Sequence, residues 1–116
     1  GLVSGVIENL IKAFKSNGDD LVVHLGPAIS INYFEVGEEI KELYLSKNIK
    51  FNRSFSFNNN KHYLDLYDAA KVILESFNIT SISGGDRCTY SEAKKYFSYR
   101  RDGVDSGRMA HLIWLK

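Results

Sequence analysis

The sequence is poor in residues that define several common protein classes: its 116 residues include one cysteine and one proline. The single Cys88 excludes an internal disulfide and any zinc module built from several cysteines, and it suits a reducing cytosol. No apolar run approaches the ~20 residues of a membrane span, and nothing resembles a signal peptide. The 15 basic and 14 acidic residues give a net charge of +1, too even to indicate nucleic acid or an anionic membrane as partner. We therefore expect a cytoplasmic protein.

What is present suits a single folded unit. Hydrophobic residues make up 44% of the chain, aromatic residues 13% and charged residues 25%, which is enough to build a core under an ordinary polar surface. The length matches one small domain. We expect residues 1–116 to form one domain or part of one, with no repeat and no linker.

Three segments are predicted to be helical. Apolar residues from Val3 to Phe14 follow helical spacing, and Asn17-Gly18 is the expected stop. Glu38 to Ser46 places its acidic residues first, where the helix dipole favours them. Asp65 to Phe77 carries an apolar stripe at the same spacing.

Strands are predicted between these helices and after them. Leu21–Leu25 and Ile79–Ser83 are short, largely apolar runs, and 51–57 mostly alternates between aromatic and polar residues. Asn58–Asn60 is a predicted turn, and Met109–Leu115 is a predicted closing strand. A mixture of elements without a strict βαβ rhythm favours an α+β fold over a doubly wound sheet.

The possible metal ligands are His24, His62, His111 and Cys88. No His-x-x-x-His or Cys-x-x-Cys spacing links them, whereas a zinc site needs three or four convergent ligands. We expect this chain to bind no metal through them. Arg87 could lower the pKa of Cys88 and make it reactive; the alternative that we favour is a small buried residue at a strand end.

The most polar segment of the chain is 96–108, in which Tyr99, Arg100 and Arg101 are adjacent. Arginine can bind phosphate or carboxylate through two parallel hydrogen bonds, and aromatic rings can stack on a flat ligand. This segment is a candidate wall of a nucleoside or phosphate pocket. The alternative is that the aromatic rings fill the core and the arginines pair with nearby aspartates.

Four blocks of sequence together resemble the second half of the YfiH family: LGPAISINYFEVGEEI (25–40), YLDLYDAAKVIL (63–74), CTYSEAKKYFSYRRDG (88–103) and SGRMAHLIWLK (106–116). They occur in the family's order and cover nearly the whole chain. Two departures are small. Phe34 stands where the family usually has tyrosine, and Tyr63 separates His62 from Leu-Asp-Leu.

The resemblance implies an α+β fold, a layered mixed β-sheet with helices packed on the outside. It also implies that this chain is the C-terminal part of a metal-dependent purine nucleoside phosphorylase that also deaminates adenosine. The zinc or copper ligands of the family would lie before Gly1, so no catalytic or metal-binding residue is expected in this chain. Its contribution would be substrate-binding residues, for which we choose Tyr99, Arg100, Arg101, Phe34 and Glu35.

The expected partners are a purine nucleoside and phosphate, together with the missing N-terminal half or another copy of the chain. The second partner follows because half a fold leaves a sheet edge or an apolar face uncovered. Two other functions stay open. One is copper-dependent oxidation of phenols, the older laccase-like description of the family, and the other is a non-catalytic fragment that acts as a structural module.

Overall fold

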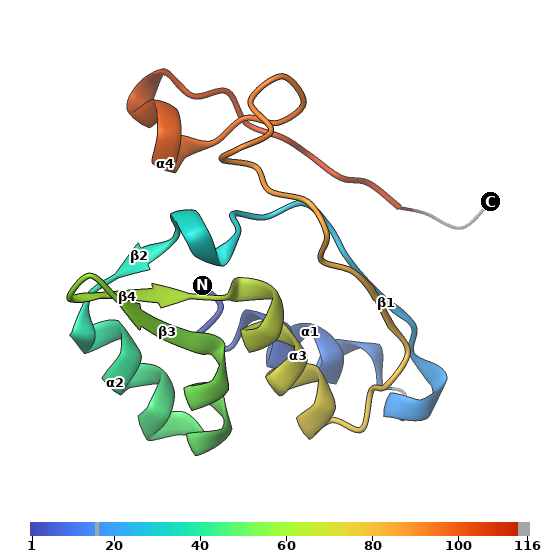
Figure 1. The fold of residues 1–116 in the computed structure, drawn as a ribbon. Coiled ribbons are helices and arrows are strands. Elements are labelled where there is room, and N and C mark those ends of the chain that lie inside the picture. The colour runs from blue at the N-terminus through green and yellow to red at the C-terminus, as the bar shows by residue number, and fades with distance from the viewer. Residues whose placement is uncertain (16, 114–116) are drawn as a thin grey trace.

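The computed structural model describes residues 1–15 and 17–113 and has the predicted α+β class, with helices and both parallel and antiparallel strand pairs. Most elements lie in a body (residues 1–15 and 17–87), and an arm (residues 88–113) extends above it (Figure 1). No helix in the described part of the chain is long and apolar enough to cross a membrane. The helices and strands are α1 Val6–Phe14, β1 Val23–Leu25, β2 Glu35–Val36, α2 Glu38–Lys47, β3 Phe55–Asn58, β4 Lys61–Leu64, α3 Leu66–Ser76, β5 Ile82–Gly84 and α4 Tyr99–Asp102.

Helix α3 is the centre of the body. Asp65 caps its first turn, because its side-chain Oδ1 accepts a hydrogen bond from the Asp68 N–H at 3.0 Å. The inner face buries Ala69, Val72 and Ile73. These side chains pack into one cluster with residues from α2, β4 and the segment between α2 and β3: Tyr44, Phe51 and Leu64.

Helix α1 packs against α3 through Ile11, which is buried beside Leu74 and Ile79. The predicted end of α1 at Asn17-Gly18 lies a few residues beyond the observed one. The helix ends at Phe14, and Lys15 adopts the left-handed conformation (φ 53°) that terminates it. A long side chain therefore occupies a position that more often holds glycine.

Strands β2, β4 and β3 form an antiparallel sheet in that order. The predicted turn at 58–60 is confirmed. Asn59 and Asn60 have φ values of 50° and 59°, the left-handed geometry that suits a two-residue hairpin turn. The predicted strand 51–57 is wrong over its first half, where Ile49–Ser54 is a 3₁₀ helix that buries Phe51. Strand β4 was not predicted.

Strands β1 and β5 form a separate parallel pair in which His24 lies opposite Ser83. They confirm the strands predicted at 21–25 and 79–83, although both begin later than expected. Gly84 has φ 83°, and a Cβ atom there would lie 2.2 Å from the Leu25 carbonyl oxygen. Only glycine permits so close an approach of the two strands.

The arm carries little regular structure apart from α4. The predicted strand Met109–Leu115 is not a strand over 109–113, and its last two residues lie outside the described residues. Leu112 and Ile113 are 81% and 98% exposed. All of residues 109–113, the described end of the arm, are exposed.

Candidate functional site

The arm meets the body where α4 faces strand β2. The Arg100 guanidinium lies 4.9 Å from the centroid of the Phe34 ring, within the range of a cation–π contact. Its Nη1 donates a hydrogen bond of 3.0 Å to the Glu35 carbonyl oxygen. Three of the five predicted substrate-binding residues thus come together from segments 65 positions apart in the chain.

A cavity of about 390 Å³ opens beside this contact. Its volume is in the range of small-molecule sites, about 300–1,000 Å³. Its lining is mostly apolar. Sequence reasoning did not connect the start of the chain with the site, yet Leu2 and Val3 line the cavity. The lining also includes Phe34, Glu35, Val36, Ile40, Leu66 and Arg100. The arginine is the cationic side chain of this lining.

The Glu35 carboxylate points to Lys61 of strand β4, with 3.5 Å between oxygen and nitrogen. Both side chains are about half exposed, so water screens the pair and it adds little stability. Glu35 and Lys61 both line a second, open cavity of about 700 Å³.

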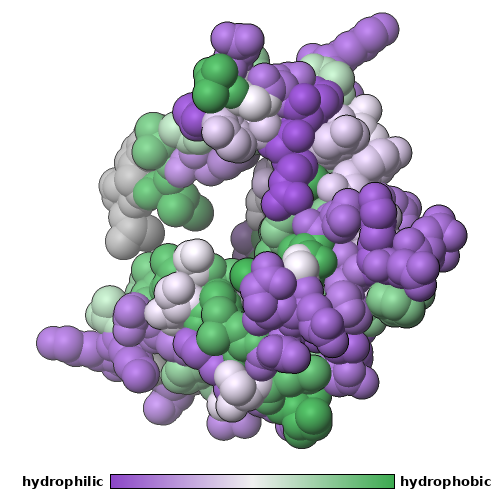
Figure 2. All heavy atoms as spheres, turned by 90° about the vertical axis from the view of Figure 1, so that its left-hand side faces the viewer, coloured by the Kyte–Doolittle hydropathy of each residue, from purple (hydrophilic) through white to green (hydrophobic). Residues whose placement is uncertain are grey.

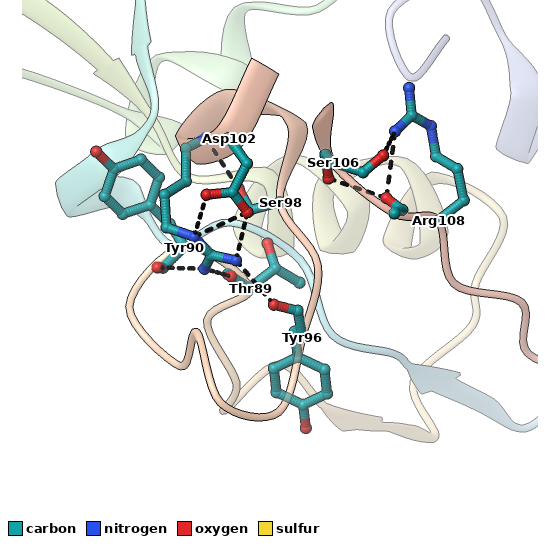
Figure 3. A network of polar contacts seen from close by, with 9 residues as sticks. Thr89, Tyr90, Tyr96, Ser98, Asp102, Ser106 and Arg108 are labelled. Carbon is teal, nitrogen blue, oxygen red and sulfur yellow. Dashed lines mark hydrogen bonds and ion pairs between the residues drawn. The ribbon is translucent and has the colours of Figure 1, made fainter. Parts of the chain in front are cut away.

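Arg101 is held inside the arm. Its guanidinium donates to the carbonyl oxygens of Thr89 (2.8 Å), Tyr90 (2.8 Å) and Tyr96 (3.0 Å), as Figure 3 shows for these three residues. It also forms a pair with the Asp102 carboxylate at 2.8 Å. Hydrogen bonding to Arg101 lowers the pKa of Asp102, and the same contact raises the pKa of Arg101. These partners use the donors with which Arg101 would have bound a phosphate.

Tyr99, next to Arg100 on α4, is 58% exposed. Its ring lies 5.2 Å from the guanidinium of Arg108 rather than against the aromatic ring of Phe34. Arg108 in turn donates to the Ser106 carbonyl oxygen at 2.7 Å, as seen in Figure 3. The structure therefore separates Tyr99 and Arg101 from the group formed by the other three residues.

Cys88 lies where the arm begins and is 9% exposed. Its backbone pairs with that of Ala28 in an isolated parallel β-bridge. Its Sγ accepts hydrogen bonds from the Ser30 hydroxyl (3.1 Å), the Ser30 N–H (3.4 Å) and the Ser91 N–H (3.4 Å). Burial raises the pKa of this thiol, but the hydrogen bonds from Ser30 and Ser91 outweigh it and lower the pKa to about 6. Both sequence interpretations hold in part, since the residue is buried and its thiolate is stabilised. The cause is a set of hydrogen bonds rather than Arg87.

The histidines lie apart from one another. His24 Nδ1 is 3.0 Å from the Ser83 hydroxyl, the His62 ring lies 4.8 Å from that of Phe57, and His111 is exposed on the arm. Within the described residues, no group of three or more histidine, cysteine, aspartate or glutamate side chains is placed to hold a metal ion. The donors of the described residues do not fit a zinc or copper site of the kind that the family resemblance implies.

Sequence reasoning missed two contacts near the junction of the arm and the body, of which the second crosses it. The Tyr67 hydroxyl accepts from the Ala28 N–H and donates to the Arg87 carbonyl oxygen, both at 2.7 Å. Burial raises the pKa of this tyrosine. The rings of Tyr33 and Tyr90 stack with centroids 4.6 Å apart. No local pattern could reveal these contacts, because each links residues far apart in sequence.

Comparison with known proteins gives consistent matches over the whole chain. The family model described as "Multi-copper polyphenol oxidoreductase laccase" matches residues 1–116. The chain is 41% identical over 115 residues to the Escherichia coli (strain K12) "Purine nucleoside phosphorylase YfiH", covering 99% of this chain and 47% of that protein. It is 37% identical over 119 residues to a Haemophilus influenzae "Purine nucleoside phosphorylase", covering 100% and 48%.

A solved structure agrees. The crystal structure of Neisseria meningitidis protein NMB0706, of family DUF152, superposes with a TM-score of 0.83 at 36% identity, covering 90% of this chain and 43% of that one. The chain spans about half the length of the curated relatives it matches. With a family model that covers every residue and relatives of this similarity, the chain belongs to the multi-copper polyphenol oxidoreductase laccase family, which includes the YfiH proteins.

Proposed function

We propose that this chain is the C-terminal half of a cytoplasmic purine nucleoside phosphorylase, and that its cavity beside Phe34 and Arg100 forms one wall of the nucleoside and phosphate site. The reaction is supported by the relatives, which are named purine nucleoside phosphorylases. The observation that carries the site is the position of Arg100, which is stacked on Phe34 and bonded to the Glu35 carbonyl at the cavity.

In this proposal different residues bind different parts of the substrates. The single hydrogen bond to Glu35 uses one of the five N–H donors of Arg100, so other donors are available to a phosphate oxygen. Phe34 and the apolar lining offer a surface on which a purine ring can lie. Glu35 can accept hydrogen bonds from ribose hydroxyls, and Tyr99 contacts substrate at the rim.

Arg101 has a positioning role in this scheme. By binding the carbonyls of Thr89, Tyr90 and Tyr96 it fixes the loop that leads into α4. Arg100 precedes Arg101 on that helix, so the direction of the Arg100 side chain depends on this loop. Of the two arginines, only Arg100 then touches substrate.

The zinc or copper of the parent family would be held by side chains outside this chain, in the N-terminal half of the full-length protein. We assign no step of the reaction to a metal held by this chain, because the donors described here do not converge. The reaction would then require both halves. Deamination of adenosine is a second reaction to be assayed with the same complex.

The family description favours a second function, copper-dependent oxidation of phenols. The exposed arginine and the cavity give no reason to prefer a neutral phenol over an anionic substrate. The third possibility is a non-catalytic structural module, which predicts binding to another polypeptide without turnover.

The test combines this chain with the part of the Escherichia coli relative that it does not match, and measures phosphate-dependent cleavage of inosine and adenosine. Arg100→Ala is expected to raise the KM for phosphate about 10- to 100-fold, the loss of a hydrogen bond to a charged group, and Arg100→Lys to restore part of it. Lys94→Ala is the control, since it removes a cation exposed elsewhere on the arm, and it should leave the KM unchanged. Turnover of phenols without phosphorolysis would refute the proposal, as would an unaltered KM in Arg100→Ala.

A further inference from the structure

The second cavity, of about 700 Å³, lies where strand β2, the start of α2 and the β3–β4 hairpin meet. Its volume is within the range of small-molecule sites. It shares Glu35, Val36 and Gly37 with the first cavity, but its remaining lining residues have no part in the proposed function. Figure 2 looks onto this end of the molecule, where hydrophilic residues (purple) surround hydrophobic ones (green). A ligand bound here would meet both kinds of surface.

Two lysines from different elements line this cavity. Lys41, on α2, is partly buried and takes part in none of the ion pairs found within the described residues. Lys61, the first residue of β4, is paired with Glu35 in the half-exposed contact described above, which water screens. Both ammonium groups can therefore donate to an anion that enters the cavity. Hydrogen bonds between two charged groups are about twice as strong as neutral ones.

An aromatic surface belongs to the same lining. The Phe57 ring is 62% exposed, although it lies on a strand of the body. Its centroid is 4.8 Å from that of His62, the residue opposite it on β4. Exposed aromatic rings are the surfaces on which nucleobases stack. Asn60, at the turn of the hairpin, adds an amide group that can both donate and accept hydrogen bonds.

We infer that the second cavity binds a nucleoside monophosphate, with its phosphate between Lys41 and Lys61 and its base on the Phe57 ring. One phosphate group is favoured over several, because the carboxylates of Glu35 and Glu38 in the same lining repel further negative charge. The Glu38 carboxylate can accept hydrogen bonds from the ribose hydroxyls. The inference goes beyond the proposed function, since it concerns a different cavity and needs no reaction there.

The test is titration calorimetry with adenosine 5′-monophosphate (AMP), on this chain combined with the part of the Escherichia coli relative that it does not match. Lys41→Ala removes a hydrogen bond to a charged group and should weaken AMP binding about 10- to 100-fold. Phe57→Ala removes the stacking surface and should weaken it about tenfold. Adenosine lacks the phosphate and inorganic phosphate lacks the base, so each should bind at least about tenfold more weakly than AMP.

Two variants serve as controls. Lys50→Ala removes a lysine exposed elsewhere on the body and should bind AMP as the unaltered protein does. Arg100→Ala alters the first cavity and should also keep its affinity for AMP. Thermal melts of every variant separate a lost contact from a damaged fold.

Three results would overturn the inference. The first is unaltered AMP affinity in Lys41→Ala or Phe57→Ala, and the second is loss of AMP binding in Arg100→Ala. The third is adenosine or phosphate binding as tightly as AMP. Phosphorolysis is measured separately: a protein that binds AMP as described but is inactive refutes the proposed function and not this site.

Discussion

The environment of Cys88 makes a quantitative prediction about one hydroxyl group. The pKa of the thiol is lowered from 9.0 to about 6, and the Ser30 hydroxyl, at 3.1 Å, is the nearest donor to its sulfur. A hydrogen bond to a charged group contributes ~1.5–3 kcal/mol, and one pKa unit corresponds to about 1.4 kcal/mol. Ser30→Ala keeps the Ser30 N–H and the donors of Ser91, so we expect it to raise the pKa of Cys88 by about 1–2 units.

The assay is the ultraviolet absorbance of the thiolate, followed against pH. Cys88 is the single cysteine, and the titration is read below about pH 8, where tyrosine side chains, with an ordinary pKa of about 10, stay protonated. Ser83→Ala is the control, since that hydroxyl is bonded to His24 on the β1–β5 pair, and it should leave the curve in place. An unchanged titration in Ser30→Ala would refute the view that hydrogen bonds stabilise this thiolate.

The same shift predicts how stability depends on pH. The folded pKa of Cys88 lies below the unfolded one, so the unfolded chain binds more protons between them. The stabilisation is fully present above about pH 9 and is lost as the pH falls toward about 6. Chemical denaturation should therefore show a contribution to the free energy of unfolding that rises across this interval, with a smaller rise in Ser30→Ala.

Three further substitutions test the packing and the arm. Leu64→Ala, at a side chain that is 1% exposed, should cost about 2–5 kcal/mol in urea unfolding; a cost below ~1 kcal/mol would mean that this core is loosely packed. Asp65→Ala removes the cap of α3 and should cost ~1 kcal/mol, whereas Asp65→Asn should retain most of the stability. Arg101→Ala breaks the bonds to three carbonyls, so limited proteolysis should cut 89–98 faster; equal rates in Arg101→Ala and the unaltered chain would contradict the positioning role, and Arg101→Lys should be intermediate.

The local residue pattern was sufficient to predict a helix or strand where that element buries one face. Helix α3 was predicted within a residue at each end because its apolar stripe and its Asp65 cap are both encoded within a few positions. The turn at 58–60 was predicted equally well from its local sequence. The segment 51–54 was not predicted, because its buried residues in the 3₁₀ helix are Phe51 and Ser54, three positions apart, whereas the sequence there shows an alternation with a period of two.

The candidate site shows a different limit. Sequence alone proposed both arginines of the pair, which are equivalent in composition. What distinguishes them is tertiary: the guanidinium of Arg101 meets three carbonyls that converge from the loop before it, whereas that of Arg100 faces Phe34 across the junction with the body. The contribution of Leu2 and Val3 to the cavity could not be read either, since it depends on how the start of the chain packs near strand β2.

The Tyr67 hydroxyl links the two stretches of chain that climb from the body, one following β1 and one following β5. It accepts a hydrogen bond from the first and donates one to the second, so a shift of either stretch breaks a hydrogen bond to this oxygen. The same two stretches are also joined where Thr89 N–H donates to the Ala28 carbonyl oxygen at 2.9 Å and where Ser30 donates to Cys88 Sγ. Displacing one stretch alone would therefore break all of these bonds, whereas moving both together would keep them.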